Sequence, residues 1–359
     1  MSKGDGMNFA PQVKTKGAVV KKGEFVFAAA YLDHGHIFGM VNGLTEAGGV
    51  CKYVYDSDPQ KVENFIKEYP DVKAVNDFEI ILQDPEIKMV AAAGVPNTRG
   101  ATGVKVMEHG KDYFVDKTPF TAMSQLDEAK CVSAKTGKKY MVYYSERLHS
   151  ESAVYAGQLI ADGVIGNVVQ VMGMGPHRLN APSRPEWFFN KEQYGGILCD
   201  IGSHQCEQFL HFADAKDAKV LSSKVGNYAN PKYPELEDFG DATLVADNGA
   251  TQYFRVDWLT PTALPTWGDG RTFILGTKGY IELRKYLNIT SDDTRSDNVY
   301  LCNENDYFHI NVQGKVGCPY FGDLILDVLN RTENAMTQAH AFKAAELCLQ
   351  AQEMAVKIC

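Results

Sequence analysis

The residues best suited to chemistry lie in two short stretches of the chain. Lys117 follows an apolar run that ends at Val115, and the segment that begins at Gly195 carries Asp200 and His204, four residues apart. A helix places residues with this spacing on one face. Histidine exchanges a proton near neutral pH, and a lysine can stabilise negative charge that develops on an oxygen atom. The pattern predicts proton transfer to or from a substrate hydroxyl group.

Other interpretations of these residues stay open. Asp200 and His204 are also a candidate pair of metal ligands, but no third ligand follows at a recognisable spacing, so we expect no metal. A solvated surface lysine is the alternative for Lys117, but its position at a strand end and the turn stiffened by Pro119 favour a functional role. For His211, an incidental histidine is the simpler interpretation.

A third candidate region is the turn from Tyr31 to Gly39, which follows the apolar run Phe25–Ala30. In a dinucleotide-binding unit, this turn lets backbone amides approach a pyrophosphate at a helix N-terminus. The strict G-x-G-x-x-G pattern is absent, because Tyr31 and Asp33 lie where its first two glycines would fall. A plain tight turn is an equal alternative. The residues predicted to contact a cofactor here are Asp33, His34, Gly35, His36 and Ile37.

Asp56 lies at the end of the second apolar run, about 20 residues beyond Gly35. A carboxylate at this position can accept hydrogen bonds from a ribose diol and repel a 2′-phosphate. The alternative role is a helix N-cap, for which Asp58, directly before Pro59, is the stronger candidate. No arginine follows Asp56, which favours NAD over NADP.

The elements around these residues predict two domains. Apolar runs alternate with helical patterns up to residue 144, which is typical of a doubly wound parallel sheet, a Rossmann-type α/β domain. Ligands bind such a domain beyond the carboxyl ends of its strands. The predicted strands are Phe25–Ala30, Cys51–Tyr55, Met89–Ala93, Asp112–Val115 and Tyr140–Tyr144.

After residue 145 the pattern indicates an α+β domain with a large, mostly antiparallel sheet. Hairpin signals at Asn248-Gly249 and at Gly276–Gly279 separate strand-like segments. Helical patterns cover residues 153–162 and 201–212, and two more close the chain. We therefore predict a disordered leader at residues 1–22, a dinucleotide-binding domain at 23–145, and a domain for substrate binding and oligomerisation at 146–359.

Composition excludes several classes of protein. The chain has 359 residues, enough for two cores, and a net charge of -9 with no basic block, which argues against nucleic-acid binding. Its longest apolar run, Phe25–Leu32, is far shorter than the roughly 20 residues of a membrane-spanning helix. Eight cysteines without a CxxC pair are typical of free thiols in a reducing cytoplasm.

The lysine-bearing stretch before the first apolar run has a second interpretation. Lys14–Lys22 followed by Phe25–Ala30 imitates a signal peptide with an alanine-rich cleavage site. We favour a leader that enters a buried first strand, because the following segments fit a nucleotide-binding fold from this strand onward.

Together these segments resemble the Gfo/Idh/MocA oxidoreductase family, named for glucose–fructose oxidoreductase and inositol dehydrogenase, from about residue 25 to 358. The resemblance implies hydride transfer between NAD or NADP and a sugar or polyol. It implies that Lys117, Asp200 and His204 are catalytic, that Pro96, Asn97 and Lys117 contact the cofactor, and that Arg147, His177 and Trp187 contact the substrate. The stretches that carry the resemblance are Leu82–Val90 with Pro96-Asn97, His109–Lys117, Arg184–Phe188 with Gly195–His204, and Gly276–Leu283.

The chain departs from the family pattern at several positions. The usual Glu-Lys-Pro is here Asp116-Lys117-Thr118-Pro119, which keeps the lysine and shifts the proline. Glu207 stands where members often carry a second aspartate, and Gly100 stands where they often carry histidine. We expect the altered glycine turn to affect the affinity for a cofactor more than the fold.

We expect a dehydrogenase that oxidises a secondary alcohol of a sugar, sugar acid or cyclitol, in which His204 removes the hydroxyl proton and Lys117 stabilises the oxygen. One alternative is a redox-neutral NAD-dependent glycosidase or lyase that uses the same residues. Another is a non-catalytic sugar-binding protein, which the altered glycine turn favours.

The resemblance also implies pairing through the second domain's sheet, so we expect a homodimer or homotetramer, with no nucleic-acid or membrane partner. Alternation in that sheet predicts Phe254, Val256 and Trp258 on one face and a second face of mixed character, with Tyr253, Arg255 and Leu259.

Overall fold

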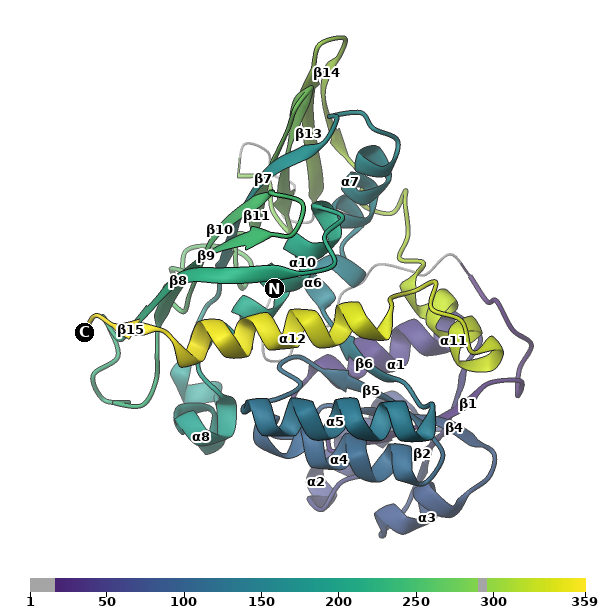
Figure 1. The fold of residues 1–359 in the computed structure, drawn as a ribbon. Helices are drawn as coiled ribbons and strands as arrows, with labels where there is room; N and C mark the ends of the chain where they lie inside the picture. Colours follow the sequence, from purple (N-terminus) through teal and green to yellow (C-terminus); the bar gives the residue numbers. More distant parts are fainter. Residues whose placement is uncertain (1–16, 290–295) are drawn as a thin grey trace. The chain divides into compact units, whose positions relative to one another are not determined.

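The computed structural model describes residues 17–289 and 296–359, which form two compact units (Figure 1). The first unit extends to Tyr143 and includes Cys318–Phe342, and the second holds Tyr144–Gly317 and Lys343–Cys359. Most of the leader predicted at residues 1–22 lies outside the described residues. Within the described ranges, no helix is long and apolar enough to cross a membrane.

A six-stranded sheet in the order β3-β2-β1-β4-β5-β6 forms the centre of the first unit. All of its neighbouring strands pair in parallel, which confirms the predicted doubly wound domain. The middle strands are largely apolar because both faces of such a sheet are covered by helices. The strands are β1 (Val26–Ala30), β2 (Val50–Tyr55), β3 (Lys73–Ala74), β4 (Ile87–Ala92), β5 (Asp112–Asp116) and β6 (Tyr140–Tyr143).

The helices of this unit alternate with its strands. An apolar helical periodicity is recognisable in the sequence only from Thr102, but α4 begins six residues earlier, at Pro96. The first turns carry buried Arg99 and Gly100, which hide the apolar periodicity. Gly103 allows β5 and β6 to approach α4, because a Cβ atom there would lie 2.3 Å from the ring of Tyr140. The helices are α1 (His36–Glu46), α2 (Pro59–Glu68), α3 (Phe78–Gln83), α4 (Pro96–Glu108) and α5 (Met123–Thr136).

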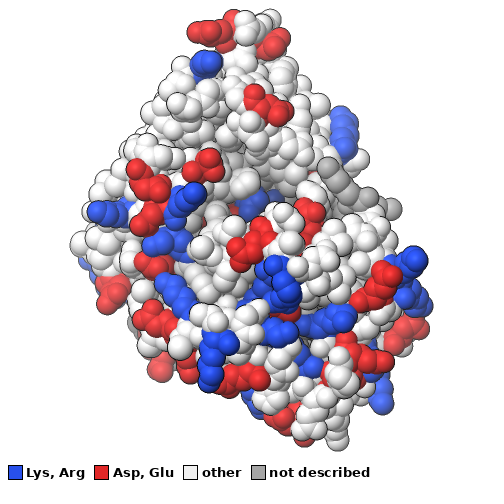
Figure 2. Space-filling model, turned by 45° about the vertical axis from the view of Figure 1, so that its right-hand side comes forward, with Lys and Arg blue, Asp and Glu red and all other residues white. Residues whose placement is uncertain are grey.

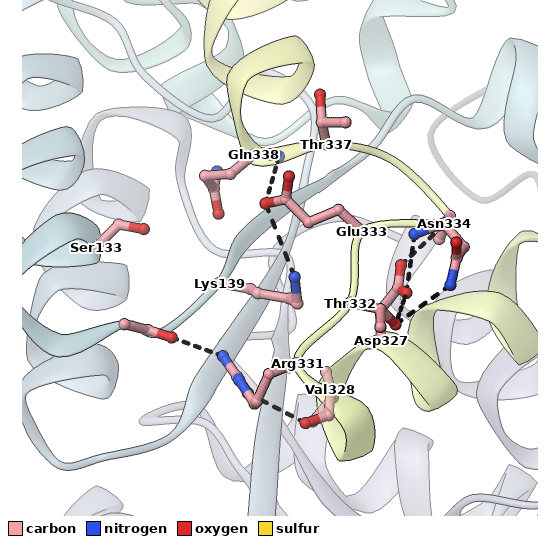
Figure 3. Close-up of polar contacts among 12 residues, drawn as sticks. Ser133, Lys139, Asp327, Val328, Arg331, Thr332, Glu333, Asn334, Thr337 and Gln338 are labelled. Carbon is pink, nitrogen blue, oxygen red and sulfur yellow. Dashed lines mark hydrogen bonds and ion pairs between the residues drawn. The ribbon is translucent and has the colours of Figure 1, made fainter.

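A segment from near the end of the chain also belongs to the first unit. Helix α11 (Tyr320–Asn330) is followed by Arg331, whose guanidinium makes two bonds of 2.8 Å to the carboxylate of Asp112 on β5. Its Nη1 also donates a hydrogen bond to the carbonyl of Val328 in α11 (Figure 3). The amide side chain of Gln338 exchanges two hydrogen bonds of 2.8 Å with the backbone of Tyr140 on β6. These polar contacts attach the segment to β5 and to the outermost strand, β6, of the parallel sheet.

The second unit contains a nine-stranded sheet in the order β14-β13-β12-β11-β7-β10-β9-β8-β15. Its pairings are antiparallel except for β7 with β10 and β8 with β15, which confirms the predicted mostly antiparallel sheet. Strand β8 lacks the apolar alternation that predicts a strand. The strands are β7 (Val168–Pro176), β8 (Ala218–Gly226), β9 (Phe239–Ala246), β10 (Thr251–Asp257), β11 (Arg271–Gly276), β12 (Gly279–Lys285), β13 (Asp297–Asn303), β14 (Tyr307–Asn311) and β15 (Val356–Lys357).

One face of this sheet packs on helix α10, and the other carries exposed apolar side chains. Phe254, Val256 and Trp258 are buried, as the alternation predicts. Gly173 on β7 leaves room for Gln205 of α10, because a Cβ atom at this position would lie 2.0 Å from the end of the Gln205 side chain. The helices assigned to this unit are α6 (Ser145–Leu148), α7 (Glu151–Ala161), η1 (Ala181–Ser183), η2 (Glu186–Phe189), α8 (Lys191–Tyr194), α9 (Ile197–Asp200) and α10 (Gly202–Phe212), and α12 (Gln338–Glu353) spans the boundary in sequence.

One buried arginine ties together the carboxyl ends of β4 and β5. Arg99 is 1% exposed, and its Nε donates a hydrogen bond of 2.6 Å to the carbonyl of Gly94. Its Nη1 donates to the carbonyls of Asp116, Lys117 and Thr118, and its Nη2 lies 3.2 Å from the Asp116 carboxylate. The guanidinium thereby fixes the backbone on both sides of Lys117.

We predict that Arg99→Met lowers the free energy of unfolding by about 3–5 kcal/mol at neutral pH, because it leaves the Asp116 charge buried without its partner. Burial raises the pKa of Asp116, but His36, His34 and Arg99 outweigh it and hold the pKa below its ordinary value. A group with a lowered folded pKa contributes stability above its unfolded pKa, about 3.9, and loses it as pH falls through the folded pKa.

The deficit of the Arg99→Met variant should therefore shrink as pH falls from neutrality toward about 4, where Asp116 begins to take up a proton in the variant. Urea unfolding at both pH values measures this. Lys105→Ala, on the exposed side of the same helix, is the control and should change stability by less than about 0.5 kcal/mol. A deficit below about 1 kcal/mol at neutral pH would show that Arg99 does not compensate a buried charge.

Candidate active site

The carboxyl edge of the parallel sheet gathers every cofactor contact predicted from the sequence. The turn Asp33–Ile37 follows β1, and Asp56 follows β2. Pro96 and Asn97 open α4 after β4, and Lys117 comes directly after β5. Because parallel strands end at the same edge of a sheet, these residues occupy the position at which doubly wound domains bind ligands.

Tyr31 shows how the β1–α1 turn accommodates the loss of its first glycine. Its φ angle of 55° lies in the left-handed region that favours glycine. A non-glycine residue in this region costs roughly 1–2 kcal/mol. The Tyr31 ring packs edge-on against Phe78 and Tyr55, with centroids at 5.1 and 5.6 Å, and burial raises its pKa to about 12. The backbone thus keeps a glycine-like conformation while the side chain joins the core.

Asp56 holds the same turn from the end of β2. Its carboxylate accepts hydrogen bonds from the backbone N–H of Leu32 at 2.6 Å and of Asp58 at 2.8 Å. The N-cap of α2 is Asp58, which accepts a bond from the N–H of Gln60, as the sequence predicts. Asp56 is therefore not the helix cap, and its contact with a ribose stays a prediction.

Two histidines of the turn face Asp116. The Nδ1 atom of His36 lies 2.8 Å from Asp116 Oδ1, and that of His34 lies 3.5 Å from Oδ2. Burial lowers the pKa of His34 well below its ordinary value, so its imidazole is neutral at physiological pH. The sequence prediction included both histidines but missed Asp116 and Arg99. The available signal was an acidic residue directly after the apolar run Tyr113–Val115.

The same three side chains place potential metal ligands within 4.8 Å of one another. The charge around them is less suitable for a cation. Asp116 is already paired with Arg99, and α1 begins at His36, so the positive end of a helix dipole adds to the guanidinium charge. This edge therefore suits an anionic group better than a divalent metal ion.

Two observations indicate that these residues fit a dinucleotide. Asn97 Oδ1 is buried and has no hydrogen-bond partner among the described residues, which leaves an acceptor at the edge for a ligand to use. Helix α1 also begins at this edge, and a helix N-terminus favours a phosphate group. The residues of the edge thus match the needs of NAD or NADP.

The second unit holds the other predicted catalytic pair. Asp200 ends α9 and His204 lies in the first turn of α10, while Ile201 between the two helices keeps a helical backbone, with φ −88° and ψ −36°. The four-residue spacing therefore still sets both side chains on one face. Both are buried, and the Tyr144 ring lies edge-on to His204 with centroids at 6.4 Å.

Arg147, a predicted substrate contact, has a protein partner in this structure. Its Nε donates to Glu207 Oε1 at 2.6 Å, and its Nη2 contacts the same oxygen. Glu207 is fully buried on α10, three residues beyond His204. The residue that replaces the family's second aspartate therefore anchors Arg147, whose contact with a substrate stays a prediction.

The other two predicted substrate contacts lie among aromatic rings. The His177 ring lies 4.2 Å from that of Trp267 and 5.3 Å from that of Trp258. Its Nδ1 lies 3.2 Å from the carbonyl of Gly175, which can only accept, so Nδ1 carries a proton. Trp187 is half-buried in the short helix η2.

The second unit also contains a buried polar network that has no sequence signature. Glu146 Oε2 accepts hydrogen bonds from the amide groups of Gln205 and Gln208, and Glu146 Oε1 lies 3.9 Å from His177 Nε2. Lys285, which donates to the side chain of Gln208, is fully enclosed, and burial lowers its pKa. These residues come from distant segments, so spacing along the chain does not reveal them.

Family models match both units of the chain. A model described as "Oxidoreductase family, NAD-binding Rossmann fold" matches residues 40–144. A second, described as "GFO/IDH/MocA C-terminal domain", matches residues 154–282.

Individual relatives agree with these models. Scyllo-inositol 2-dehydrogenase (NAD(+)) of Bacillus subtilis is 27% identical over 264 residues, which are 71% of this chain and 72% of that protein. D-xylose dehydrogenase of Paenarthrobacter nicotinovorans is 22% identical over 149 residues, 40% of this chain, and the chain spans only 38% of that relative's length.

A solved structure matches along nearly the whole chain. This crystal structure, of a protein classed as an oxidoreductase from Erwinia carotovora atroseptica, is 46% identical with a TM-score of 0.91, and the match covers 94% of this chain and 100% of that one. Both units thus have the same relatives, and the chain belongs to the Gfo/Idh/MocA family of oxidoreductases.

Proposed function

We propose that the chain is an NAD(P)-dependent dehydrogenase that oxidises a secondary alcohol of a sugar, sugar acid or cyclitol. One observation carries the proposal: the β1–α1 turn, Asp56 and Lys117 all lie at the carboxyl edge of the parallel sheet. Relatives named as dehydrogenases of D-xylose and scyllo-inositol support this substrate class. The domain at 23–145 would bind the dinucleotide, and the domain at 146–359 would bind the substrate.

The residues that would hold the dinucleotide are those of the sheet edge. The amides at the start of α1 suit its pyrophosphate, and the Asp56 carboxylate suits a ribose diol, which favours NAD over NADP. When bound, the nicotinamide accepts the hydride that the substrate carbon releases. The contacts are Asp33, His34, Gly35, His36, Ile37, Asp56, Pro96, Asn97 and Lys117.

The protein side of the reaction is a proton transfer. His204 accepts the proton of the substrate hydroxyl while Lys117 stabilises the negative charge on that oxygen, and Asp200 orients the histidine. The carbinol carbon loses a hydrogen and two electrons as hydride, so the alcohol becomes a ketone. Arg147, His177 and Trp187 would contact the other hydroxyl groups of the substrate.

We predict that Lys117→Ala reduces kcat by at least about 100-fold, the usual effect of removing a group that stabilises charge in the transition state. The substrate would first be found by following dinucleotide reduction across a panel of sugars and cyclitols. Lys105→Ala, a lysine on the exposed side of α4, is the control and should keep wild-type turnover.

Two results would count against this role for Lys117. A kcat within a few-fold of wild type would remove the residue from the mechanism. A loss of about 2–5 kcal/mol in the free energy of unfolding, as a core cavity produces, would assign it a structural role instead.

For assembly, we propose a homo-oligomer, at least a dimer, paired through the open face of the nine-stranded sheet. On this face Met172 is level with Tyr253, and Leu275 is level with Tyr280. Each of these four side chains is more than a third exposed. An exposed apolar patch of this kind is typical of an interface, and two-fold symmetry is the commonest way to cover it.

The surface and the cysteines support the remaining expectations. Acidic and basic side chains are interspersed on the face shown in Figure 2, which supports the prediction that nucleic acid is not a partner. All eight cysteines are free thiols, and we infer a cytoplasmic, reducing location from them.

We predict that light scattering at micromolar concentration gives at least twice the monomer mass of 39.7 kDa. Charged groups are costly in the core of an interface, so the double substitution Met172→Glu/Leu275→Glu should yield monomers. Glu63→Gln, a substitution on an exposed helix of the other unit, should leave the mass unchanged. A wild-type mass near 40 kDa would reject the proposed assembly.

A further inference from the structure

The ribose end of the proposed nucleotide site contains a second carboxylate and an ammonium group. Asp33 lies in the β1–α1 turn, Asp56 follows β2, and Lys61 lies in the first turn of α2. Lys61 Nζ is 2.6 Å from Asp33 Oδ1 and 3.8 Å from Asp56 Oδ1. The ammonium group therefore lies between two carboxylates and is bonded to that of Asp33.

The two carboxylates differ in how firmly the protein holds them. Asp56 accepts two backbone hydrogen bonds, from Leu32 and Asp58, and its side chain is only 3% exposed. The Asp33 side chain is 18% exposed and bonds to Lys61, whose own side chain is 33% exposed. Asp56 is thus a fixed part of the pocket, whereas the Asp33–Lys61 pair forms its more accessible part.

The charges of these groups favour a diol over a phosphate. Two carboxylates and one ammonium group leave one net negative charge, which suits the hydroxyl donors of a ribose. A phosphate monoester carries about 1.5 to 2 negative charges at neutral pH and would be repelled. Burial lowers the pKa of Lys61, but the hydrogen bond and charge of Asp33 outweigh it and raise the pKa, so the amine stays charged.

Lys61 itself, however, is the kind of group that binds phosphate. A lysine ammonium recognises phosphate as a point charge on a flexible side chain. Its position beside Asp56 places it at the ribose end of the site. The pocket therefore accepts a 2′-phosphate only if the Lys61 ammonium group is not already paired with a carboxylate.

We propose that Asp33 is a specificity-determining residue, which holds the Lys61 ammonium group and thereby makes the pocket select NAD over NADP. This inference rests on the proposed function, because it concerns which of two cofactors the same site accepts. Without the Asp33 carboxylate, Lys61 is released to pair with a 2′-phosphate, and the pocket loses one negative charge. Asp33 stands where the usual turn has its second glycine, so this substitution adds a selective charge to the turn.

Asp33 is a cleaner residue to change than Asp56. Substitution of Asp56 would also remove the hydrogen bond that fixes the Leu32 amide, and so would disturb the turn. The Asp33 carboxylate bonds to the side chain of Lys61 near the surface of the unit. Asp33→Asn therefore changes the charge with little effect on the backbone, and Asp33→Ser provides a second variant of the same kind.

The test measures the dissociation constants of NAD+ and NADP+ by calorimetry on the full-length wild type and its variants, without any substrate. Wild type should bind NAD+ more tightly. In Asp33→Asn and Asp33→Ser, NADP+ affinity should rise about tenfold or more, and NAD+ affinity should change less than about threefold. Glu63→Gln removes a carboxylate from the exposed face of α2 and should alter neither constant.

A double variant tests whether Asp33 acts through Lys61. In Asp33→Asn/Lys61→Met the gain in NADP+ affinity should disappear, because the two residues are coupled. An affinity ratio that stays unchanged in Asp33→Asn and Asp33→Ser overturns the inference, and so does a gain that persists in the double variant. A wild-type protein that binds neither dinucleotide overturns the proposed function itself, so the two failures are distinguishable.

Discussion

The buried Asp116 carboxylate is the interaction on which the edge of the parallel sheet depends. It ends β5, pairs with Arg99 from α4, and contacts His36 from the β1–α1 turn. A single charged group thereby connects three elements that a doubly wound domain must align at its carboxyl edge. Because the carboxylate is fully buried, the arrangement persists only while the Arg99 guanidinium remains in place. The position of Lys117, the next residue, follows from this constraint.

The altered turn is consistent with this edge being a working nucleotide site. The usual glycines allow close approach of the backbone to a pyrophosphate. Here Tyr31 adopts the glycine-like conformation, and the packing of its ring against Phe78 offsets the cost of that conformation. Asp33 adds a negative charge that pairs with Lys61. Tyr31 and Asp33 thus change the side chains of the turn relative to the usual glycines, while the backbone keeps a glycine-like conformation.

The sequence predicts the fold well where the burial pattern is regular. The apolar run Phe25–Ala30 corresponds to β1, and the predicted alternation around Phe254 matches the buried face of β10. The start of α4 is hidden because its buried residues there are an arginine and a glycine. Contacts such as Arg147 with Glu207 join residues 60 positions apart and depend on tertiary packing, so no local pattern reveals them. The spacing of Asp200 and His204 predicts proton transfer in general, and the resemblance to the family implies their specific catalytic roles.

A titration of the purified wild-type chain with NADH, followed by the change in nicotinamide fluorescence, tests the nucleotide site most directly. We predict saturable binding at one site per chain, with a dissociation constant in the micromolar range, about −8 kcal/mol in free energy. Asp116→Asn should weaken this binding at least about tenfold, because the turn loses the carboxylate that aligns it. The absence of any saturable signal from the folded wild-type protein would contradict the claim that the rebuilt turn still forms a nucleotide site.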